Sequence, residues 1–341
     1  MLELHDPHDA FAHLDAYLAG AGFWGSDDLV ADLYLGYGLS AAFRRSQVNP
    51  PPEPCPLPLL ACRIREASDR EPHATAFRVG EWERTWNDGQ YAAAVERVRS
   101  AISRGDVYQV NLVQHLSATF EGDPTALALA LAPLHPLVSR PFITDTWAIV
   151  SASPELFLRR SGQTLQTMPI KGTRPAGVHV EGPKDAAEHT MIVDLERNDL
   201  ARVCHPGTVR WPELMAEREL AGVTHLVSTV EGTMRDDVTF GETLAALFPG
   251  GSVTGAPKIS ALDLIAGLEP VGRGASMGAL GTVQPNGDFD LALTIRTFAI
   301  AESRIHFWVG GGIVWDSQPE AEIEESWVKA RPILAALEHA A

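Results

Sequence analysis

The residue best placed to do chemistry is Lys171, in the run Met168-Pro-Ile-Lys-Gly-Thr-Arg-Pro175. Apolar residues precede it and Gly172 follows it. We therefore expect Lys171 at the end of a strand, partly removed from water and close to backbone. A lysine amine in such surroundings can act as a nucleophile. The alternative is a solvated loop lysine, which is the commoner occurrence beside a Gly-Thr turn.

Two pairs of carboxylates recur at helical spacing. Asp185 and Glu188 lie three residues apart in a predicted helix over 185–200. Glu322 and Glu325 lie three residues apart in the predicted C-terminal helix. Such pairs share a helix face and repel each other, and their oxygens suit a hard divalent cation such as Mg²⁺. A solvated acidic face is the alternative for either pair alone.

Two further charged residues lie inside apolar stretches. Glu155 follows Ser-Pro and precedes Leu-Phe-Leu, so we expect it to be partly buried with a raised pKa, as a general acid needs. An exposed turn glutamate is the alternative. Arg296 lies in the apolar run 291–298, which predicts a strand, and a guanidinium there needs an anion or a carboxylate partner.

Strands are predicted around these residues. Residues 106–116 alternate apolar and polar side chains, which places Gln109 and Asn111 on one face of a strand. Residues 306–316 predict a strand interrupted by the three glycines 310–312. Such an interruption either lets a ligand approach the backbone or marks a bulge.

The glycine-rich run Phe248-Pro-Gly-Gly-Ser-Val-Thr-Gly-Ala-Pro-Lys258 precedes a predicted helix over 259–268. It is not a P-loop, because Ala256-Pro257 separates Lys258 from Gly255 and no Ser or Thr follows the lysine directly. Its backbone amides, at the start of a helix, can instead hold a carboxylate.

The composition narrows the class of protein. The chain has 341 residues, 45% of them hydrophobic, and a net charge of −17, which opposes binding to nucleic acid or to an anionic membrane. We expect no signal peptide and no membrane span, because neither a basic leader nor an apolar run of about 18 residues is present. Three cysteines give no disulfide or zinc pattern, so a reduced, cytoplasmic location is expected.

Prolines cluster between residues 50 and 58. They predict an extended connector, because proline restricts the backbone and donates no hydrogen bond. We therefore expect residues 1–58 to be a short N-terminal portion and connector that belongs to the same fold as the main body, 59–341.

Eight motifs, in order from about Trp86 to Leu337, resemble those of the chorismate-utilising enzymes, and the likeness is greatest to the aminodeoxychorismate synthase component I branch. The motifs are Gly-Asp-Val-Tyr-Gln-Val-Asn-Leu, Ser-Pro-Glu-Leu, Pro-Ile-Lys-Gly-Thr-Arg-Pro, Glu-His-x-Met-Ile-Val-Asp-Leu-x-Arg-Asn-Asp, His-Leu-Val-Ser, Gly-Ser-Val-Thr-Gly-Ala-Pro-Lys, Ile-Arg-Thr and Gly-Gly-Gly-Ile-Val. The resemblance implies an α+β fold in which large antiparallel sheets pack face to face with helices outside. It also implies a chorismate-binding catalytic domain in the main body.

The resemblance also implies roles for individual residues. Mg²⁺ would be held by Glu188 and Glu325, with Asp185 and Glu322 supporting through water. Glu155 would protonate the departing C4 hydroxyl of chorismate. The implied substrate contacts are Arg296, Lys329, Gly311, Gly312, His225, Thr254, Gly172 and Thr173, together with Ser276, which stands where the family usually has tyrosine.

Two positions distinguish the reactions within this family. Gln109 stands where isochorismate-forming members have a water-activating lysine, and an amide cannot deprotonate water. Lys171 stands where anthranilate synthases typically have alanine. The resemblance therefore implies synthesis of 4-amino-4-deoxychorismate through a covalent Lys171 intermediate, for p-aminobenzoate and folate. Ammonia would come from a separate glutamine amidotransferase subunit.

Two alternatives remain from the sequence. One is an anthranilate or 2-amino-2-deoxyisochorismate synthase component I. The other is a chorismate-binding subunit without catalytic activity, which the serine at 276 and the short N-terminal portion motivate.

Overall fold

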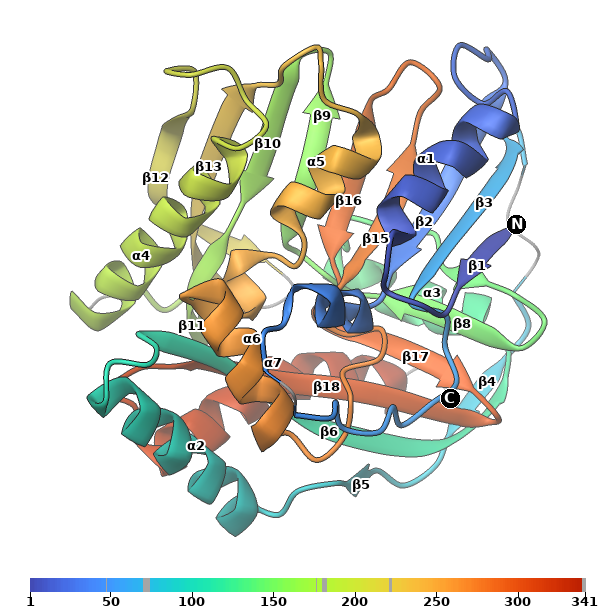
Figure 1. The fold of residues 1–341 in the computed structure, drawn as a ribbon. Helices are drawn as coiled ribbons and strands as arrows, with labels where there is room; N and C mark the ends of the chain where they lie inside the picture. The colour runs from blue at the N-terminus through green and yellow to red at the C-terminus, as the bar shows by residue number, and fades with distance from the viewer. Residues whose placement is uncertain (47, 70–73, 176, 180–182, 221–222, 339–341) are drawn as a thin grey trace.

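The computed structural model describes residues 1–46, 48–69, 74–175, 177–179, 183–220 and 223–338. Within these ranges, the side chains of Thr173, Pro175, Pro183, Lys184, Asp185 and Glu338 are outside the description. The described chain folds into two antiparallel sheets with helices around them (Figure 1).

The larger sheet has ten strands among the described residues. In spatial order they are β1 (Leu2–Leu4), β3 (Leu60–Glu66), β2 (Leu29–Leu35), β15 (Ala279–Val283), β16 (Phe289–Leu293), β9 (Leu156–Ser161), β10 (Thr164–Met168), β13 (Val223–Thr233) and β11 (Ile170–Pro175), with β12 (Arg210–Leu220) also paired to β13. The N-terminal strands β1 and β2 both pair with β3, so the N-terminal portion contributes directly to this sheet.

The smaller sheet has eight described strands. They are β14 (Gly255–Ala256), β6 (Gln109–Gly122), β18 (Arg304–Ile313), β17 (Thr297–Ala301), β8 (Trp147–Ser151) and β7 (Phe142–Ile143) in spatial order, with β4 (Phe77–Val79) and β5 (Glu83–Arg84) paired to β6. The long pairing of β6 with β18 brings Gln109 and Asn111 to the same end of the sheet as Gly310–Gly312.

Helices lie around both sheets (Figure 1). They are α1 (Ala10–Gly20), α2 (Asp88–Ser103), α3 (Pro124–Leu131), α4 (Pro183–Leu200), α5 (Phe240–Leu247), α6 (Lys258–Leu268) and α7 (Pro319–Glu338), with 3₁₀ turns η1 (Tyr37–Phe43), η2 (Ala132–Leu134) and η3 (Gly251–Val253). α4 packs against β11 and β13, and α7 packs against β18 and α2. The acidic segments thus form helices, as the spacing predicts.

Alternation along β17 shows that the smaller sheet is covered on both faces. Ala299 and Ala301 belong to the hydrophobic core that also contains the larger sheet. Phe298 and Ile300 point to the opposite face and pack in a second core with α3 and α7. Side chains of a strand alternate between its faces, so one face of this sheet meets the other sheet and one meets helices. The expected α+β fold with antiparallel sheets packed face to face is confirmed.

Two predicted strands differ from the structure. The run 291–298 is not one strand: β16 ends at Leu293 in the larger sheet and β17 begins at Thr297 in the smaller one. Arg296 lies in the crossing between them with φ 50°, which a regular strand does not allow. Conversely, β18 is not interrupted at its glycines, because Gly310–Gly312 stay paired with β6.

Cys55, Cys62 and Cys204 are buried free thiols. Among the described residues, no helix combines the length and apolarity that crossing a membrane requires.

Candidate active site

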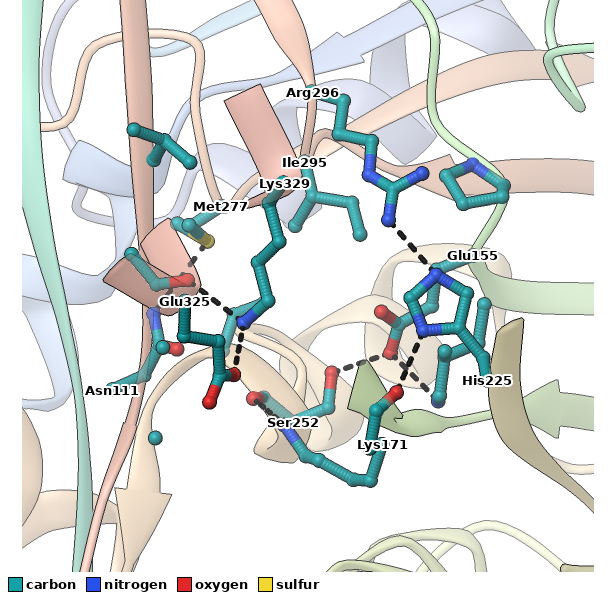
Figure 2. A pocket seen from close by; sticks show the side chains of 18 of the residues that line it. Asn111, Glu155, Lys171, His225, Ser252, Met277, Ile295, Arg296, Glu325 and Lys329 are labelled. Carbon is teal, nitrogen blue, oxygen red and sulfur yellow. Dashed lines mark hydrogen bonds and ion pairs between the residues drawn. The ribbon is translucent and has the colours of Figure 1, made fainter. Parts of the chain in front are cut away.

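Residues of α4, α7, β6, β18, β11, β13 and the turn η3 line one pocket, and Figure 2 shows its side chains. Its lining residues are Asn111, Pro154, Glu155, Ile170, Lys171, Gly172, Glu188, His225, Ser252, Val253, Met277, Ile295, Arg296, Trp308, Val309, Gly310, Gly311, Gly312, Glu322, Glu325 and Lys329. Segments far apart in the sequence therefore meet around one cavity.

Lys171 and Glu155 are linked through one serine. Lys171 Nζ donates to the carbonyl oxygen of Ser252 at 2.8 Å, and the hydroxyl of Ser252 donates to Glu155 Oε1 at 2.6 Å (Figure 2). The Lys171 side chain is 12% exposed. Lys171 is in β11, where Gly172 adopts φ 64° beside a shift in the pairing with β13. The lysine is thus partly desolvated, as expected, but lies near the start of a strand.

Glu155 is only 5% exposed. Burial raises the pKa of this carboxyl above its ordinary value, although Lys171, the Ser252 hydroxyl and the Ile170 amide oppose that change. A buried carboxyl with a raised pKa keeps its proton at higher pH, which a general acid requires. The expected burial and the raised pKa of Glu155 are both confirmed.

Gln109, at the start of β6, donates from Nε2 to Glu188 Oε1 at 2.7 Å. Glu188 Oε1 also lies 3.9 Å from Lys171 Nζ. Gly312 faces these groups, because a Cβ there would lie 2.1 Å from Gln109 Nε2 and 2.6 Å from Glu188 Oε1. Glycine at this position therefore makes room for a carboxylate against the strand.

The acidic side chains of α7 lie beside the neighbouring glycine. A Cβ on Gly311 would lie 3.4 Å from Glu325 Oε1 and 3.7 Å from Glu322 Oε2. Lys329, one turn further on, pairs with Glu325 at 2.8 Å and donates to the carbonyl of Gly310 at 3.0 Å. Burial lowers the pKa of Lys329, but Glu325, Glu188 and Glu322 outweigh it, so the pKa is raised overall. Lys329 is therefore positively charged in the pocket at neutral pH.

Arg296 is 6% exposed at the crossing between the sheets. Its Nη2 donates to Nε2 of His225 at 2.8 Å, and Nδ1 of His225 donates to the carbonyl of Gly172 at 2.8 Å (Figure 2). Burial, with Arg296 beside it, lowers the pKa of His225 to about 3, so the imidazole is neutral. Burial lowers the pKa of Arg296 to about 10, which still leaves it charged at neutral pH. A neutral histidine thus orients a buried cation.

Three of the four residues expected to hold Mg²⁺ lie in the same pocket. Glu188, Glu322 and Glu325 line it, whereas the Asp185 side chain lies outside the described residues. No three acidic, histidine or cysteine side chains of the described chain form a group that could hold a metal ion. The donors are nonetheless all carboxylate oxygens beside two glycines that leave space for them, and this donor chemistry fits Mg²⁺.

Three residues expected at the substrate are placed differently or not described. Thr254 is fully buried behind η3 and its hydroxyl donates to the carbonyl of Gly250 at 3.0 Å. Ser276 is also fully buried and does not line the pocket, whereas the next residue, Met277, does line it. The side chain of Thr173 lies outside the described residues.

Sequence reasoning did not assign a role to several pocket residues, among them Ser252, Asn111 and Met277. Ser252 lies within the glycine-rich run, which offers no pattern that marks its hydroxyl. Asn111 lies two residues after Gln109 in the same strand, so both side chains are on one face. That spacing could have indicated that Asn111 also lies at the site. Met277 follows the position expected to contact substrate, and Asn111 Nδ2 lies 3.8 Å from its sulfur.

Comparison with known proteins identifies the class. Residues 45–335 match the family described as chorismate binding enzyme. The chain is 42% identical over 262 residues to anthranilate synthase component 1 of Thermus thermophilus, covering 73% of this chain and 57% of the relative. It is 38% identical over 288 residues to aminodeoxychorismate synthase component 1 of Salmonella typhimurium, covering 80% of this chain and 63% of the relative.

A solved structure of a protein named anthranilate synthase component I has a similar fold. Anthranilate synthase component I from Streptococcus pneumoniae superposes with a TM-score of 0.77 at 25% identity, covering 89% of this chain and 80% of that one. The chain belongs to the chorismate binding enzyme family, which confirms the resemblance of its motifs. Within this family its relatives include both aminodeoxychorismate and anthranilate synthases, and the chain spans 57% to 63% of the length of the two curated relatives above.

Proposed function

We propose that this protein is an aminodeoxychorismate synthase component I, which converts chorismate and ammonia to 4-amino-4-deoxychorismate. The observation that carries the proposal is the linkage of Lys171 and Glu155 through Ser252 in one pocket. It supplies a nucleophile and an acid side by side. The relatives named aminodeoxychorismate synthase component 1 support this assignment.

The first step forms a covalent intermediate. The amine nitrogen of Lys171 bonds to C2 of the ring through its lone pair, the ring double bonds shift, and the C4–O bond breaks. Glu155 gives its proton to the departing hydroxyl, which leaves as water, and the added amine then returns one proton to Glu155. A buried acid with a raised pKa is suited to this role.

The second step releases the enzyme. Ammonia bonds to C4, the double bonds shift back, and the C2–N bond breaks. Lys171 leaves as the amine and takes up the proton that the added ammonia loses. The balance is chorismate plus ammonia giving 4-amino-4-deoxychorismate plus water. Covalent catalysis divides one difficult displacement into two easier ones.

Cations in the pocket account for binding of a dianionic substrate by an acidic protein. Arg296 and Lys329 are both charged and largely buried. Their interactions with a substrate carboxylate are stronger here than at the surface, because the surroundings have a low dielectric constant. Gly311 lies beside Lys329, because a Cβ on Gly311 would lie 3.3 Å from Lys329 Nζ. The amides of Gly311 and Gly312 are a further proposed carboxylate contact.

Mg²⁺ is part of the proposal. Glu188 and Glu325 would hold it, with Glu322 and Asp185 supporting. When bound, it would neutralise a substrate carboxylate and polarise it as a Lewis acid. Titration calorimetry of Mg²⁺ into the protein and into Glu188→Gln and Glu325→Gln variants checks this assignment without measuring activity.

Anthranilate synthesis is the second candidate, because the relative at 42% identity is an anthranilate synthase component 1. Lys171 distinguishes the two, since a direct attack of ammonia at C2 needs no lysine. A 2-amino-2-deoxyisochorismate synthase would likewise not need it. Isochorismate formation is disfavoured, because Gln109 bonds to Glu188 and cannot act as a base.

A separate glutamine amidotransferase subunit is the proposed source of ammonia. The named relatives are components 1, which supports a second component. With ammonium salt in excess, the proposed reaction does not require that partner.

The test is product identification. The protein is incubated with chorismate, Mg²⁺ and ammonium salt, and a 4-amino-4-deoxychorismate lyase is then added. We expect p-aminobenzoate. Anthranilate or isochorismate as the main product would overturn the assignment, and binding of chorismate without turnover would favour a non-catalytic subunit.

A further inference from the structure

We propose that Glu196 is a positioning residue, which fixes the turn η3 and thereby sets the geometry between Lys171 and Glu155. This inference rests on the proposed use of those two groups in the reaction. Glu196 lies on α4, two turns after Glu188, and it does not line the pocket.

The contact is a buried hydrogen bond to the backbone. The amide of Gly251 donates to Glu196 Oε1 at 3.0 Å, and the glutamate is 4% exposed. The turn lies tightly against the helix here, because a Cβ on Gly251 would lie 2.6 Å from Cδ2 of Leu195. A buried carboxyl oxygen that accepts an amide hydrogen bond away from water makes a directional contact, because the hydrogen bond is electrostatically stronger in a medium of low dielectric constant.

The next residue along the chain is Ser252, whose carbonyl and hydroxyl hold the two reacting groups. A shift of Gly251 moves both Ser252 groups together. It would therefore separate the amine from the ring carbon and the acid from the departing oxygen. A misplacement of about 1 Å can reduce a rate by about 100-fold.

A second contact from α4 restrains the following residues. Asp199, three residues after Glu196, pairs with Lys258 at 2.5 Å, and Lys258 Nζ also donates to the carbonyl of Leu247 at 3.2 Å. The helix therefore contacts one end of the 247–258 segment at Lys258, and Lys258 in turn contacts Leu247 at the other end. The same helix carries Glu188, whose carboxylate lies beside Lys171. α4 therefore fixes the position of the 247–258 segment relative to the Glu188 carboxylate.

Other contacts restrain η3 through its carbonyl groups. Thr254 donates to Gly250, and Arg273 Nη1 donates to the carbonyl of Val253 at 2.9 Å. Glu196 is the acceptor for the Gly251 amide. Thr254 and Arg273 are donors to carbonyl groups of the turn, whereas Glu196 is an acceptor for an amide of the turn. The Thr254 and Arg273 donors therefore cannot take over the hydrogen bond that Glu196 accepts from Gly251.

The experiment compares two substitutions of similar size. Glu196→Gln keeps an oxygen that can accept from Gly251, whereas Glu196→Met fills the space without an acceptor. We expect kcat to fall by about 10- to 100-fold in Glu196→Met with the KM for chorismate within about 3-fold, and kcat within about 3-fold of wild type in Glu196→Gln. Glu96→Ala is the control, because Glu96 is an exposed glutamate on α2.

A second measurement does not depend on turnover. Crystal structures of the variants should show Ser252 displaced from Lys171 in Glu196→Met and in place in Glu196→Gln. Glu196→Ala is the substitute if the methionine variant does not fold. An undisplaced Ser252, or full kcat without an acceptor, would overturn the proposal.

The two hypotheses fail in different ways. If the wild-type protein makes anthranilate, the proposed function fails, but the same rate comparison on that product still tests Glu196. If the wild-type protein turns nothing over, the variant structures decide. If the wild-type protein makes 4-amino-4-deoxychorismate and Glu196→Met does so equally fast, only the positioning role fails.

Discussion

Ser252 is the residue on which the two proposed reacting groups depend. Its carbonyl is fixed by the backbone, but its hydroxyl can be removed without disturbing the Lys171 contact. That hydroxyl lowers the pKa of Glu155 against the larger effect of burial. Ser252→Ala therefore raises the pKa of Glu155 further, and the acid keeps its proton to higher pH.

We expect the alkaline fall in kcat/KM to move to higher pH in Ser252→Ala, with the maximal rate about 10-fold lower because the acid is less well oriented. The measurement is a pH profile of kcat/KM for wild type, Ser252→Ala and the exposed helical control Ser100→Ala. A fall that stays in place or moves to lower pH would show that Glu155 is not the acid.

At the residue scale, sequence alone is informative where chemistry and spacing coincide. Lys171 beside glycine and Glu155 between apolar residues both line the pocket, as their surroundings predict. Ser252 was missed because its role depends on a turn bringing backbone and hydroxyl to two distant segments. The resemblance places Ser276 at the substrate, but Ser276 is fully buried and its neighbour Met277 lines the pocket. Spacing along the chain does not show which of two adjacent side chains faces a cavity.

At the scale of elements, the glycines of β18 allow the acidic helices to approach the sheet. Gly312→Ala would place a Cβ where the ends of Gln109 and Glu188 now lie. Both are flexible side-chain ends, so we expect the fold to survive and the carboxylate to move. The KM for chorismate should rise by about 10-fold or more, with Tm within a few degrees.

Gly267→Ala is the matched control for this substitution. Gly267 is near the end of α6, where an added Cβ would meet no described atom within 4 Å, and alanine favours helix by about 1 kcal/mol. Its kinetics should equal those of wild type. An unchanged KM in Gly312→Ala would contradict the role given to this glycine.

The elements themselves are predicted with mixed success. Helical spacing identifies α4 and α7, because their acidic and apolar residues recur every three or four positions. The run 291–298 predicts one strand, because its apolar pattern continues through the crossing at Arg296, and that prediction is wrong. The apolar pattern of this run indicates that most of its residues are buried. It does not show that residues up to Leu293 belong to one sheet and residues from Thr297 to the other.

At the scale of the whole molecule, a buried acid makes stability depend on pH. Burial, and after it Asp199, raise the pKa of Glu196 from 4.5 to about 7. The folded state thus binds this proton more tightly than the unfolded state. Its contribution to stability is present below pH 4.5 and is lost as pH rises to about 7.

Glu196→Gln removes this titration. Urea unfolding at pH 5 and pH 8 should show that wild type loses more stability between these values than the variant, by about 2 kcal/mol. Glu96→Ala should behave as wild type. An equal or larger loss in Glu196→Gln would show that Glu196 ionises normally in the folded protein.

The pairing of distant strands is the part of the fold that local pattern does not contain. β6 pairs with β18 almost 200 residues later. The family resemblance supplied the sheet architecture, and the structure confirms it. The position of the pocket follows from that pairing together with the docking of α4 and α7 on the sheets.

The most direct test of the central claim is the mass of the protein after exposure to chorismate and Mg²⁺ without ammonia. If Lys171 is the nucleophile, wild type should gain the mass of chorismate less one water, on the peptide that contains Lys171. Lys171→Ala should gain nothing and should lose at least about 100-fold in kcat with ammonium present. An enzyme that forms 4-amino-4-deoxychorismate at full rate in Lys171→Ala, or an adduct located on another residue, would contradict the account.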